Sequence, residues 1–109
     1  HSNEMKQLVT ILMDNAIKHC KKEGTIFLEL KKENNNILLE VKNEGKPIPK
    51  GEEEKIFERF YRVDKSRNRD ENRYGLGLAI AKEIVFNHHG KIRAYSNDGI
   101  TTFEVIFKK

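Results

Sequence analysis

The sequence predicts an α+β fold, a two-layer sandwich in which helices cover one face of a mixed or antiparallel sheet. Two segments, residues 3–22 and 78–88, repeat apolar residues at helical spacing. Four other segments predict strands and form two pairs, each joined by a short polar turn, and the first of them, residues 25–31, alternates apolar and polar residues. The 109 residues are enough for one such domain and too few for two.

The first helix is expected over residues 3–22, and Gly24 stands where such a helix would end. Its apolar face is formed by Met5, Leu8, Val9, Leu12 and Ala16. Residues 25–31 and 37–42 then predict a hairpin around a polar turn at residues 33–36. A second hairpin is expected from residues 91–96 and 100–107, because Asn97-Asp98-Gly99 is a strong turn signal.

The centre of the chain is less regular. Residues 43–51 hold both prolines and two glycines, which indicates a loop, and residues 52–57 predict a short helix with glutamates at its positive end. Residues 61–74 alternate in charge and predict a mobile loop. The second long helix follows, opened by glycines and closed by Gly90.

Composition excludes several classes of protein. The net charge of +4 comes from 21 basic and 17 acidic residues that are interspersed, and no basic tract with aromatic residues suggests a nucleic-acid surface. No run of about 18 apolar residues is present, so nothing predicts a membrane span. The single cysteine, Cys20, excludes an internal disulfide and favours a reducing compartment.

Two groups of residues suggest an anionic ligand. Gly75-Leu76-Gly77-Leu78 lies where a helix begins, so its backbone N–H groups and the helix dipole favour a phosphate, although a flexible hinge explains the glycines equally well. Asn15, Lys18 and His19 share one face of the first helix and suit a polyanion with its metal, whereas the simpler explanation is a polar stripe facing water.

Other charged groups carry weaker signals. The arginines of residues 61–74 suit phosphate oxygens, but a solvated loop explains most of them. His88 and His89 at a helix end fit capping or a surface position better than metal ligation, and nothing near Cys20 in the sequence suggests a nucleophile.

Four segments, in order, resemble the conserved boxes of the catalytic, ATP-binding (HATPase) domain of bacterial two-component sensor histidine kinases. The N box, G1 box, F box and G2 box correspond to Leu12-Met13-Asp14-Asn15-Ala16-Ile17-Lys18, Asn43-Glu44-Gly45-Lys46-Pro47-Ile48, Ile56-Phe57-Glu58-Arg59-Phe60-Tyr61-Arg62-Val63-Asp64 and Gly75-Leu76-Gly77-Leu78-Ala79-Ile80-Ala81.

The resemblance implies a sandwich of the GHKL (Bergerat) type with a lid loop, spanning residues 1–109. It also implies that the family's first strand is missing here, and that the preceding dimerisation and phosphoacceptor domain lies outside this chain. The expected location is the cytoplasmic portion of a membrane-bound sensor kinase.

The resemblance also implies a role for individual residues. ATP and Mg²⁺ are the expected cofactors, with Asn15 as the metal ligand and Asn15, Lys18 and Arg62 as the catalytic set. Asn43 would accept a hydrogen bond from the adenine amino group, with Gly45 close to the base. The implied nucleotide-binding residues are Asn15, Lys18, His19, Asn43, Gly45, Ile48, Tyr61, Arg62, Gly75, Leu76, Gly77, Leu78 and Thr101.

Three positions depart from the family pattern, because Asn43 replaces an aspartate and Pro47 and Arg73 each stand where a glycine is common. Related ATPases place a water-activating glutamate one turn before the metal-binding asparagine, where this chain has Ile11, which cannot act as a general base. The resemblance therefore implies phosphoryl transfer to a partner rather than efficient hydrolysis.

The expected function is delivery of the γ-phosphoryl group of Mg-ATP to a histidine on the dimerisation domain of the parent kinase, in signal transduction that includes a response regulator. One alternative is a degenerate, non-catalytic module of the same fold that acts through protein contacts. Another is a serine-directed kinase of the anti-sigma type. This alternative is disfavoured by the F-box segment Phe57-Glu58-Arg59-Phe60-Tyr61-Arg62.

Overall fold

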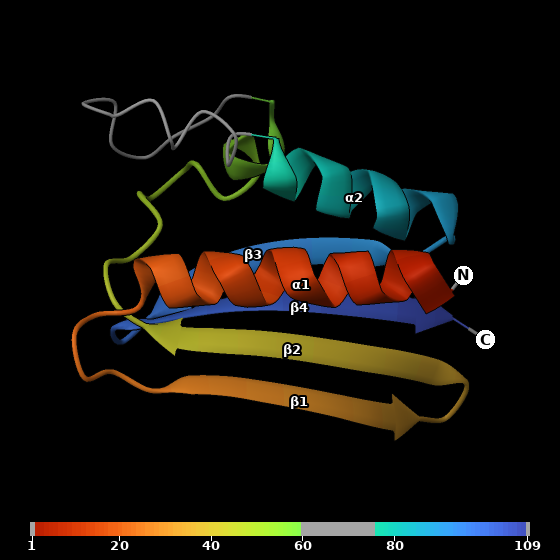
Figure 1. Cartoon of the computed structure of the whole chain (residues 1–109), viewed down its shortest axis with the longest axis horizontal. Helices are drawn as coiled ribbons and strands as arrows, with labels where there is room; N and C mark the ends of the chain where they lie inside the picture. The colour runs from red at the N-terminus through yellow and green to blue at the C-terminus, as the bar shows by residue number, and fades with distance from the viewer. Residues whose placement is uncertain (1, 60–75, 109) are drawn as a thin grey trace.

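The structure, a computed structural model, describes residues 2–59 and 76–108. Its described strands form one antiparallel sheet in the order β1-β2-β4-β3, and helices α1 and α2 lie on the same face of it (Figure 1). The elements are α1 (Ser2–His19), β1 (Ile26–Glu33), β2 (Asn36–Glu44), the 3₁₀ helix η1 (Lys55–Phe57), α2 (Gly77–Asn87), β3 (Lys91–Asn97) and β4 (Ile100–Lys108). The predicted two-layer α+β sandwich is confirmed. Of the two sheet types that the sequence allows, mixed and antiparallel, the described sheet is antiparallel.

The core lies between the helices and the sheet. Strand β2 buries every second residue near its end, and β4 buries the residues paired with them, so both strands present an apolar face to the helices. Each large aliphatic side chain buried there contributes about 1.5–3 kcal/mol. The buried apolar side chains include Leu8, Leu12 and Ala16 of α1, Leu39 and Val41 of β2, Ala81, Ile84 and Val85 of α2, and Phe103 and Val105 of β4.

The β3–β4 turn is the two-residue connection that the sequence predicts. Asp98 and Gly99 both have positive φ, 54° and 81°, as a type I′ turn requires. This turn fixes the register of the hairpin, so that Ser96 lies directly opposite Thr101.

Helix α1 ends at His19, three residues before its predicted end. The chain leaves the helix because Cys20 forms a β-bridge with Gly45, and the Lys21 N–H donates to the Glu44 carbonyl at 2.8 Å. The prediction that Gly24 ends the helix was therefore wrong, because this pairing joins residues far apart in the sequence.

Helix α2 ends with a Schellman motif. The N–H groups of His89 and Gly90 donate to the carbonyls of Phe86 and Val85, at 3.0 and 2.9 Å. His89, not Gly90, adopts the left-handed conformation (φ 62°). Gly90 is needed for another reason, since a Cβ there would lie 2.7 Å from the Ile106 carbonyl oxygen.

The predicted short helix at residues 52–57 is reduced to the 3₁₀ turn η1. The glutamates before it lie outside the turn, and its buried residues are Ile56 and Phe57. Phe57 packs edge-on against Phe103 of β4, with ring centroids 6.1 Å apart. This contact attaches η1 to the sheet.

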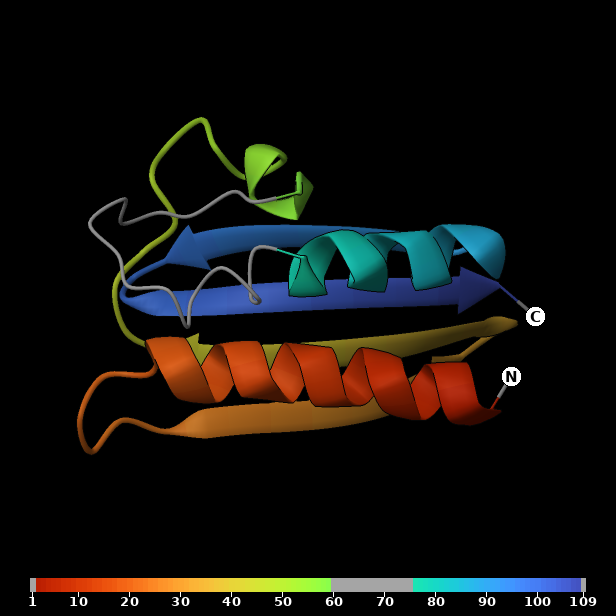
Figure 2. The ribbon, with the colours of Figure 1, turned by 45° about the horizontal axis from the view of Figure 1, so that its top comes forward.

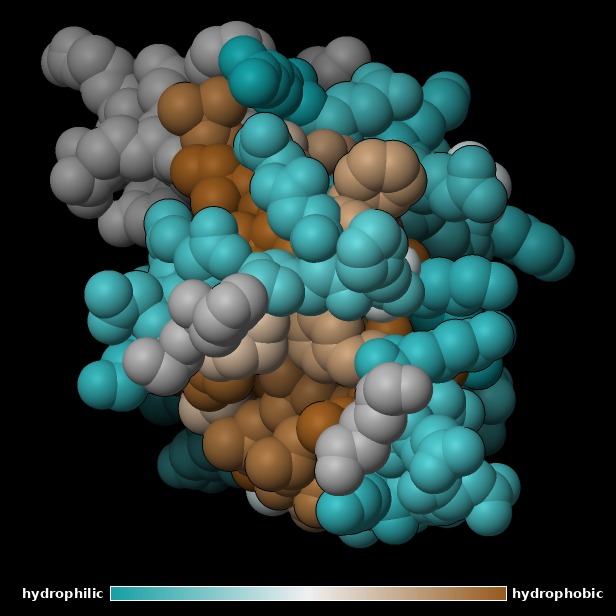
Figure 3. Space-filling model, turned by 90° about the vertical axis from the view of Figure 1, so that its right-hand side faces the viewer, coloured by the Kyte–Doolittle hydropathy of each residue, from teal (hydrophilic) through white to brown (hydrophobic). Residues whose placement is uncertain are grey.

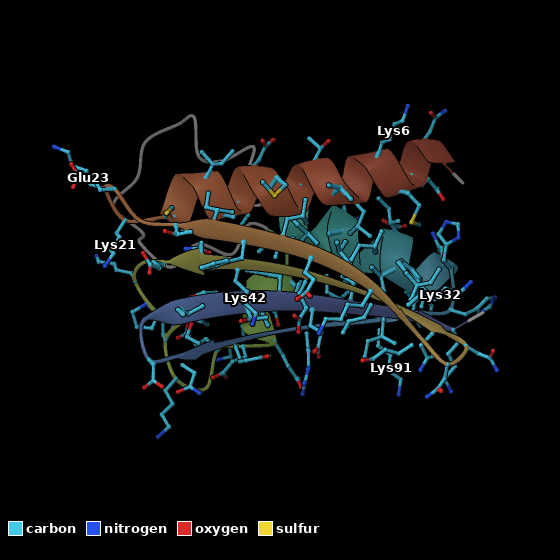
Figure 4. The ribbon with its side chains drawn as sticks, turned by 90° about the horizontal axis from the view of Figure 1, so that it is seen from below. Lys6, Lys21, Glu23, Lys32, Lys42 and Lys91 are labelled. Atoms are coloured by element: carbon cyan, nitrogen blue, oxygen red, sulfur yellow. The ribbon has the colours of Figure 1, made fainter. Side chains whose placement is uncertain are left out.

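The second face of the sheet carries no helix in the described chain. Figure 4 shows the two layers edge-on, with Lys6 pointing outward from α1 and Lys91 on the uncovered side. Strand β1 is an edge strand, and Leu28 and Leu30 are 52% and 70% exposed although they pair with core residues of β2 and so share the helix-bearing face. Figure 3 views the end of the molecule where both termini lie and shows apolar side chains at the surface in its lower half. No described helix is long and apolar enough to cross a membrane.

Candidate functional site

The predicted nucleotide-binding residues that the structure describes come from the C-terminal half of α1, the end of β2, the loop after it, the start of β4 and the first turn of α2. The ends of α1, β2 and β3 and the start of β4 lie at one end of the molecule (Figure 1). Figure 2 shows the first turn of α2 beside α1, facing the same end. The fold thus gathers segments that are far apart in the sequence.

Asn43 lies at the end of β2 on the face toward the helices, and only 1% of its surface is exposed. Its Nδ2 donates a long hydrogen bond, 3.3 Å, to the Glu44 carbonyl. Its Oδ1 accepts no hydrogen bond from any described residue. A buried amide oxygen without a donor costs about 1–3 kcal/mol, so this oxygen is suited to accept from a ligand N–H group.

Gly45 occupies a position with no room for a side chain. A Cβ there would lie 2.3 Å from the His19 carbonyl oxygen and 3.2 Å from Asn43 Nδ2. The Gly45 N–H donates to the Gly99 carbonyl at 3.1 Å. The glycine therefore lets the end of β2 pass between the end of α1 and the β3–β4 turn.

A chain of hydrogen bonds runs from the loop after β2 into the sheet. The Ile48 N–H donates to Ser96 Oγ at 2.8 Å, and Ser96 Oγ lies 2.7 Å from Thr101 Oγ1. Thr101 is 6% exposed and pairs with Asn43 across β2 and β4. Ser96, Thr101 and Asn43 thus form one polar row across three strands.

Ser96 is a residue that the sequence analysis missed. Its hydroxyl could have been found from the register of the predicted hairpin, because a two-residue turn at Asp98-Gly99 pairs residue 96 with residue 101. The contact with Ile48 depends on the path of the loop, which the sequence does not reveal.

The first turn of α2 is open to an anion. Leu76 is its N-cap and makes no side-chain capping bond, while the first intrahelical bond runs from the Ile80 N–H to the Leu76 carbonyl at 2.9 Å. The preceding N–H groups have no intrahelical acceptor and, with the helix dipole, favour a phosphate by about 0.3–1 kcal/mol per charge. Among the described residues, a Cβ on Gly77 would meet Ile11 Cγ2, at 3.6 Å.

Helix α1 presents the predicted polar residues near its C-terminal end. Asn15 is half-buried, whereas Lys18 and His19 are exposed and Asp14 is exposed on a different side of the helix. The described residues contain no cluster of three or more His, Cys, Asp or Glu side chains that could hold a metal.

Tyr61, Arg62 and Gly75, and with them the lid loop, lie outside the described residues. The same holds for Arg73. Their predicted roles stay predictions.

Polar pairs elsewhere have structural roles. His88 is the C-cap residue of α2, where its backbone N–H meets carbonyls of the last turn, and its Nε2 lies 2.5 Å from Glu4 Oε1 of α1. On the uncovered face Arg93 bonds Glu104, and this bond raises the pKa of Arg93. The shallow depression around that pair lies on β3 and β4, on the opposite face of the sheet from the candidate site.

The sequence profile of the family described as "Histidine kinase-, DNA gyrase B-, and HSP90-like ATPase" matches residues 1–109. The chain belongs to this family. A relative named signal transduction histidine-protein kinase ArlS, from Staphylococcus haemolyticus, is 43% identical to this family domain over 107 residues, which is 97% of the chain. The ArlS of Staphylococcus aureus strain USA300 is 41% identical over 96% of the chain. The chain spans 24% of the length of both relatives.

Solved structures agree with this assignment. A nucleotide-free catalytic domain of the histidine kinase ThkA superimposes with a TM-score of 0.85 at 29% identity, covering 100% of this chain and 69% of that one. The mycobacterial sensor histidine kinase MprB gives a TM-score of 0.83 at 26% identity, covering 99% of this chain and 72% of that one. The GHKL fold implied by the sequence is confirmed.

Proposed function

We propose that this chain is the ATP-binding catalytic domain of a sensor histidine kinase. It binds Mg-ATP at the end of the sandwich described above. It delivers the γ-phosphoryl group to a histidine on the dimerisation domain of the parent kinase.

The buried Oδ1 of Asn43 carries this proposal. It lies beside Thr101 and accepts no hydrogen bond from a described residue, so an adenine amino group can satisfy it. An amide in place of the family's aspartate gives a neutral bond rather than a charge-assisted one. The hydrogen bond from adenine to Asn43 is therefore weaker than one to an aspartate. Each 1.4 kcal/mol of binding free energy lost lowers the affinity about tenfold.

The phosphate end of the site combines three kinds of group. The free N–H groups at the start of α2 accommodate the phosphates, Lys18 adds positive charge, and Asn15 offers an oxygen to Mg²⁺. When bound, Mg²⁺ neutralises charge on the phosphate oxygens. Positioning and charge neutralisation are the main contributions that a protein makes to phosphoryl transfer.

Transfer rather than hydrolysis follows from the side chains of α1. Ile11, one turn before Asn15, is an aliphatic residue near Gly77, and Asp14 is exposed on another side of the helix. Neither side chain can activate a water molecule beside the phosphates. The nucleophile then comes from a partner, the phosphoacceptor histidine.

The proposed partners are ATP, the dimerisation domain and a response regulator. A second structure of ThkA shows it in complex with the response regulator TrrA. Its ThkA chain superimposes on this chain with a TM-score of 0.78 at 28% identity. Because ATP and a free cysteine, Cys20, both fit a reducing compartment, we propose a cytoplasmic location.

Calorimetric titration of this chain with Mg-ADP tests the proposal. We expect saturable binding below a few millimolar, and Asn15→Ala is expected to weaken it at least about tenfold, or ~1.4 kcal/mol, because the metal-bridging oxygen is lost. Asn87→Ala is the matched control, since this exposed asparagine lies at the other end of α2.

Two results would contradict the proposal. Absence of saturable binding by the unmodified chain would favour the non-catalytic module that acts through protein contacts. Equal affinities for the Asn15→Ala and Asn87→Ala variants would show that the metal-bound phosphates lie elsewhere.

A further inference from the structure

The hydrogen bonds around Ser96 define the direction in which protons are donated. A serine hydroxyl has one hydrogen to donate and two lone pairs to accept. Because the Ile48 N–H can only donate, it uses one lone pair of Ser96 Oγ, at 2.8 Å. The hydroxyl hydrogen of Ser96 then has Thr101 Oγ1, at 2.7 Å, as its acceptor among the described residues.

This direction leaves the Thr101 hydroxyl hydrogen available for a ligand. Thr101 is nearly fully buried and forms no other side-chain hydrogen bond with a described residue. The opposite arrangement, in which Thr101 donates to Ser96, would leave the Ser96 hydrogen without an acceptor among the residues that the structure describes. A chain in which each donor points the same way is also strengthened by mutual polarisation.

Ile48 is held at this point by its neighbours in the sequence. Pro47 and Pro49 have no N–H group, so Ile48 supplies the single backbone donor of residues 47–49. In the described chain, its bond to Ser96 is the hydrogen bond that connects residues 46–50 with the sheet. Ser96 therefore joins two parts of the candidate site, the loop after β2 and the polar row on the sheet.

We infer that Ser96 is a positioning residue, which orients the Thr101 hydroxyl to donate a hydrogen bond to an unprotonated ring nitrogen of adenine. This nitrogen is next to the amino group from which Asn43 accepts a hydrogen bond. The inference rests on the proposed function. Asn43 and Thr101 are direct cross-strand partners, and such side chains have Cβ atoms about 4.5–5.5 Å apart. One acceptor and one donor at that spacing match the adjacent amino group and ring nitrogen of adenine, on either its N1 or its N7 side.

Titrations with ADP, 1-deaza-ADP and 7-deaza-ADP, each with Mg²⁺, test this role. The unmodified chain should bind one of the two deaza analogues about five- to tenfold more weakly than ADP, a loss of ~1–1.4 kcal/mol. Which analogue is affected identifies the nitrogen. Ser96→Ala should weaken ADP binding by the same factor and abolish the preference for ADP over that analogue.

Three further variants separate positioning from a structural effect. Ser96→Thr keeps the hydroxyl and should restore the preference. Thr101→Val should abolish it, and the double variant Ser96→Ala/Thr101→Val should lose no more than either single variant, because both remove one chain of bonds. Thr102→Val removes a buried hydroxyl of the same strand on the opposite sheet face and should leave the preference unchanged.

The outcomes are distinct. An equal loss of affinity for ADP and both analogues in Ser96→Ala would show a structural role and overturn the inference, as would an unchanged preference in Ser96→Ala or in Thr101→Val. Absence of ADP binding by the unmodified chain would instead refute the proposed function, and the inference with it.

Discussion

Gly45 and Gly77 are both glycines of the candidate site, but the structure gives them different reasons to lack a side chain. Gly45 is enclosed by backbone, because its Cβ position lies 2.3 Å from the His19 carbonyl oxygen. Gly77 has open space at its Cβ position, with Ile11 Cγ2 at 3.6 Å. Packing therefore explains Gly45, whereas nothing in the packing of the described chain requires Gly77, and a ligand at the start of α2 would explain it.

Alanine substitutions at these two positions should therefore separate stability from binding. Gly45→Ala is expected to lower the free energy of unfolding by about 1–3 kcal/mol, because the backbone of α1 or β2 must shift. Gly77→Ala should keep the stability and weaken Mg-ADP binding about fivefold, or ~1 kcal/mol. Denaturant unfolding and calorimetry measure the two effects. Unchanged Mg-ADP affinity in Gly77→Ala would show that the phosphates do not bind at the first turn of α2.

At the scale of single elements, the end of α2 is constrained by His89. Its left-handed backbone (φ 62°) is the conformation that glycine adopts most readily, and the hydrogen bonds of His89 and Gly90 depend on it. The left-handed conformation costs an L-residue about 1–2 kcal/mol. Glycine avoids this cost, but it loses more backbone entropy on folding, which offsets part of the gain.

His89→Gly should therefore stabilise the domain by about 0.5–1 kcal/mol, measured by guanidinium unfolding. Glu83→Gly is the control, because this exposed residue lies inside α2, where glycine destabilises by about 1 kcal/mol. If both substitutions destabilise alike, the described end of the helix is incorrect.

The elements whose signals are local were predictable from the sequence. The apolar spacing of α1 and α2, the alternation in β1, and the Asp98-Gly99 turn depend on neighbouring residues. The end of α1 at His19 depends instead on a bridge between Cys20 and Gly45, which are 25 residues apart in the sequence. No local pattern reports such a pairing.

The same distinction holds for the candidate site. The family resemblance identified Asn43, in the G1 box, and Thr101, outside the four boxes, and the structure brings them together as cross-strand partners. Ser96 lies in no box, and its role depends on how the loop around Ile48 returns to the sheet. A side chain that acts through two others cannot be recognised from its own sequence context.

At the scale of the whole molecule, the two layers differ in what their surfaces offer. The helices cover one face of the sheet, and the ends of α1 and β2 and the start of β4 lie at one end of the molecule, which the first turn of α2 faces (Figure 1, Figure 2). The uncovered face carries charged side chains, among them Lys91 (Figure 4) and Arg93, two residues further along the same strand. We therefore expect nucleotide binding at one end of the helix-covered side.

Backbone amide chemical shifts of the ¹⁵N-labelled chain, recorded during titration with Mg-ADP, test this claim most directly. We expect saturable shift changes in residues 15–21, 43–48, 76–80 and 96–101, and none at Lys91, Arg93 or Glu104 on the uncovered face. Shift changes centred on the uncovered face, or none at millimolar Mg-ADP, would contradict it.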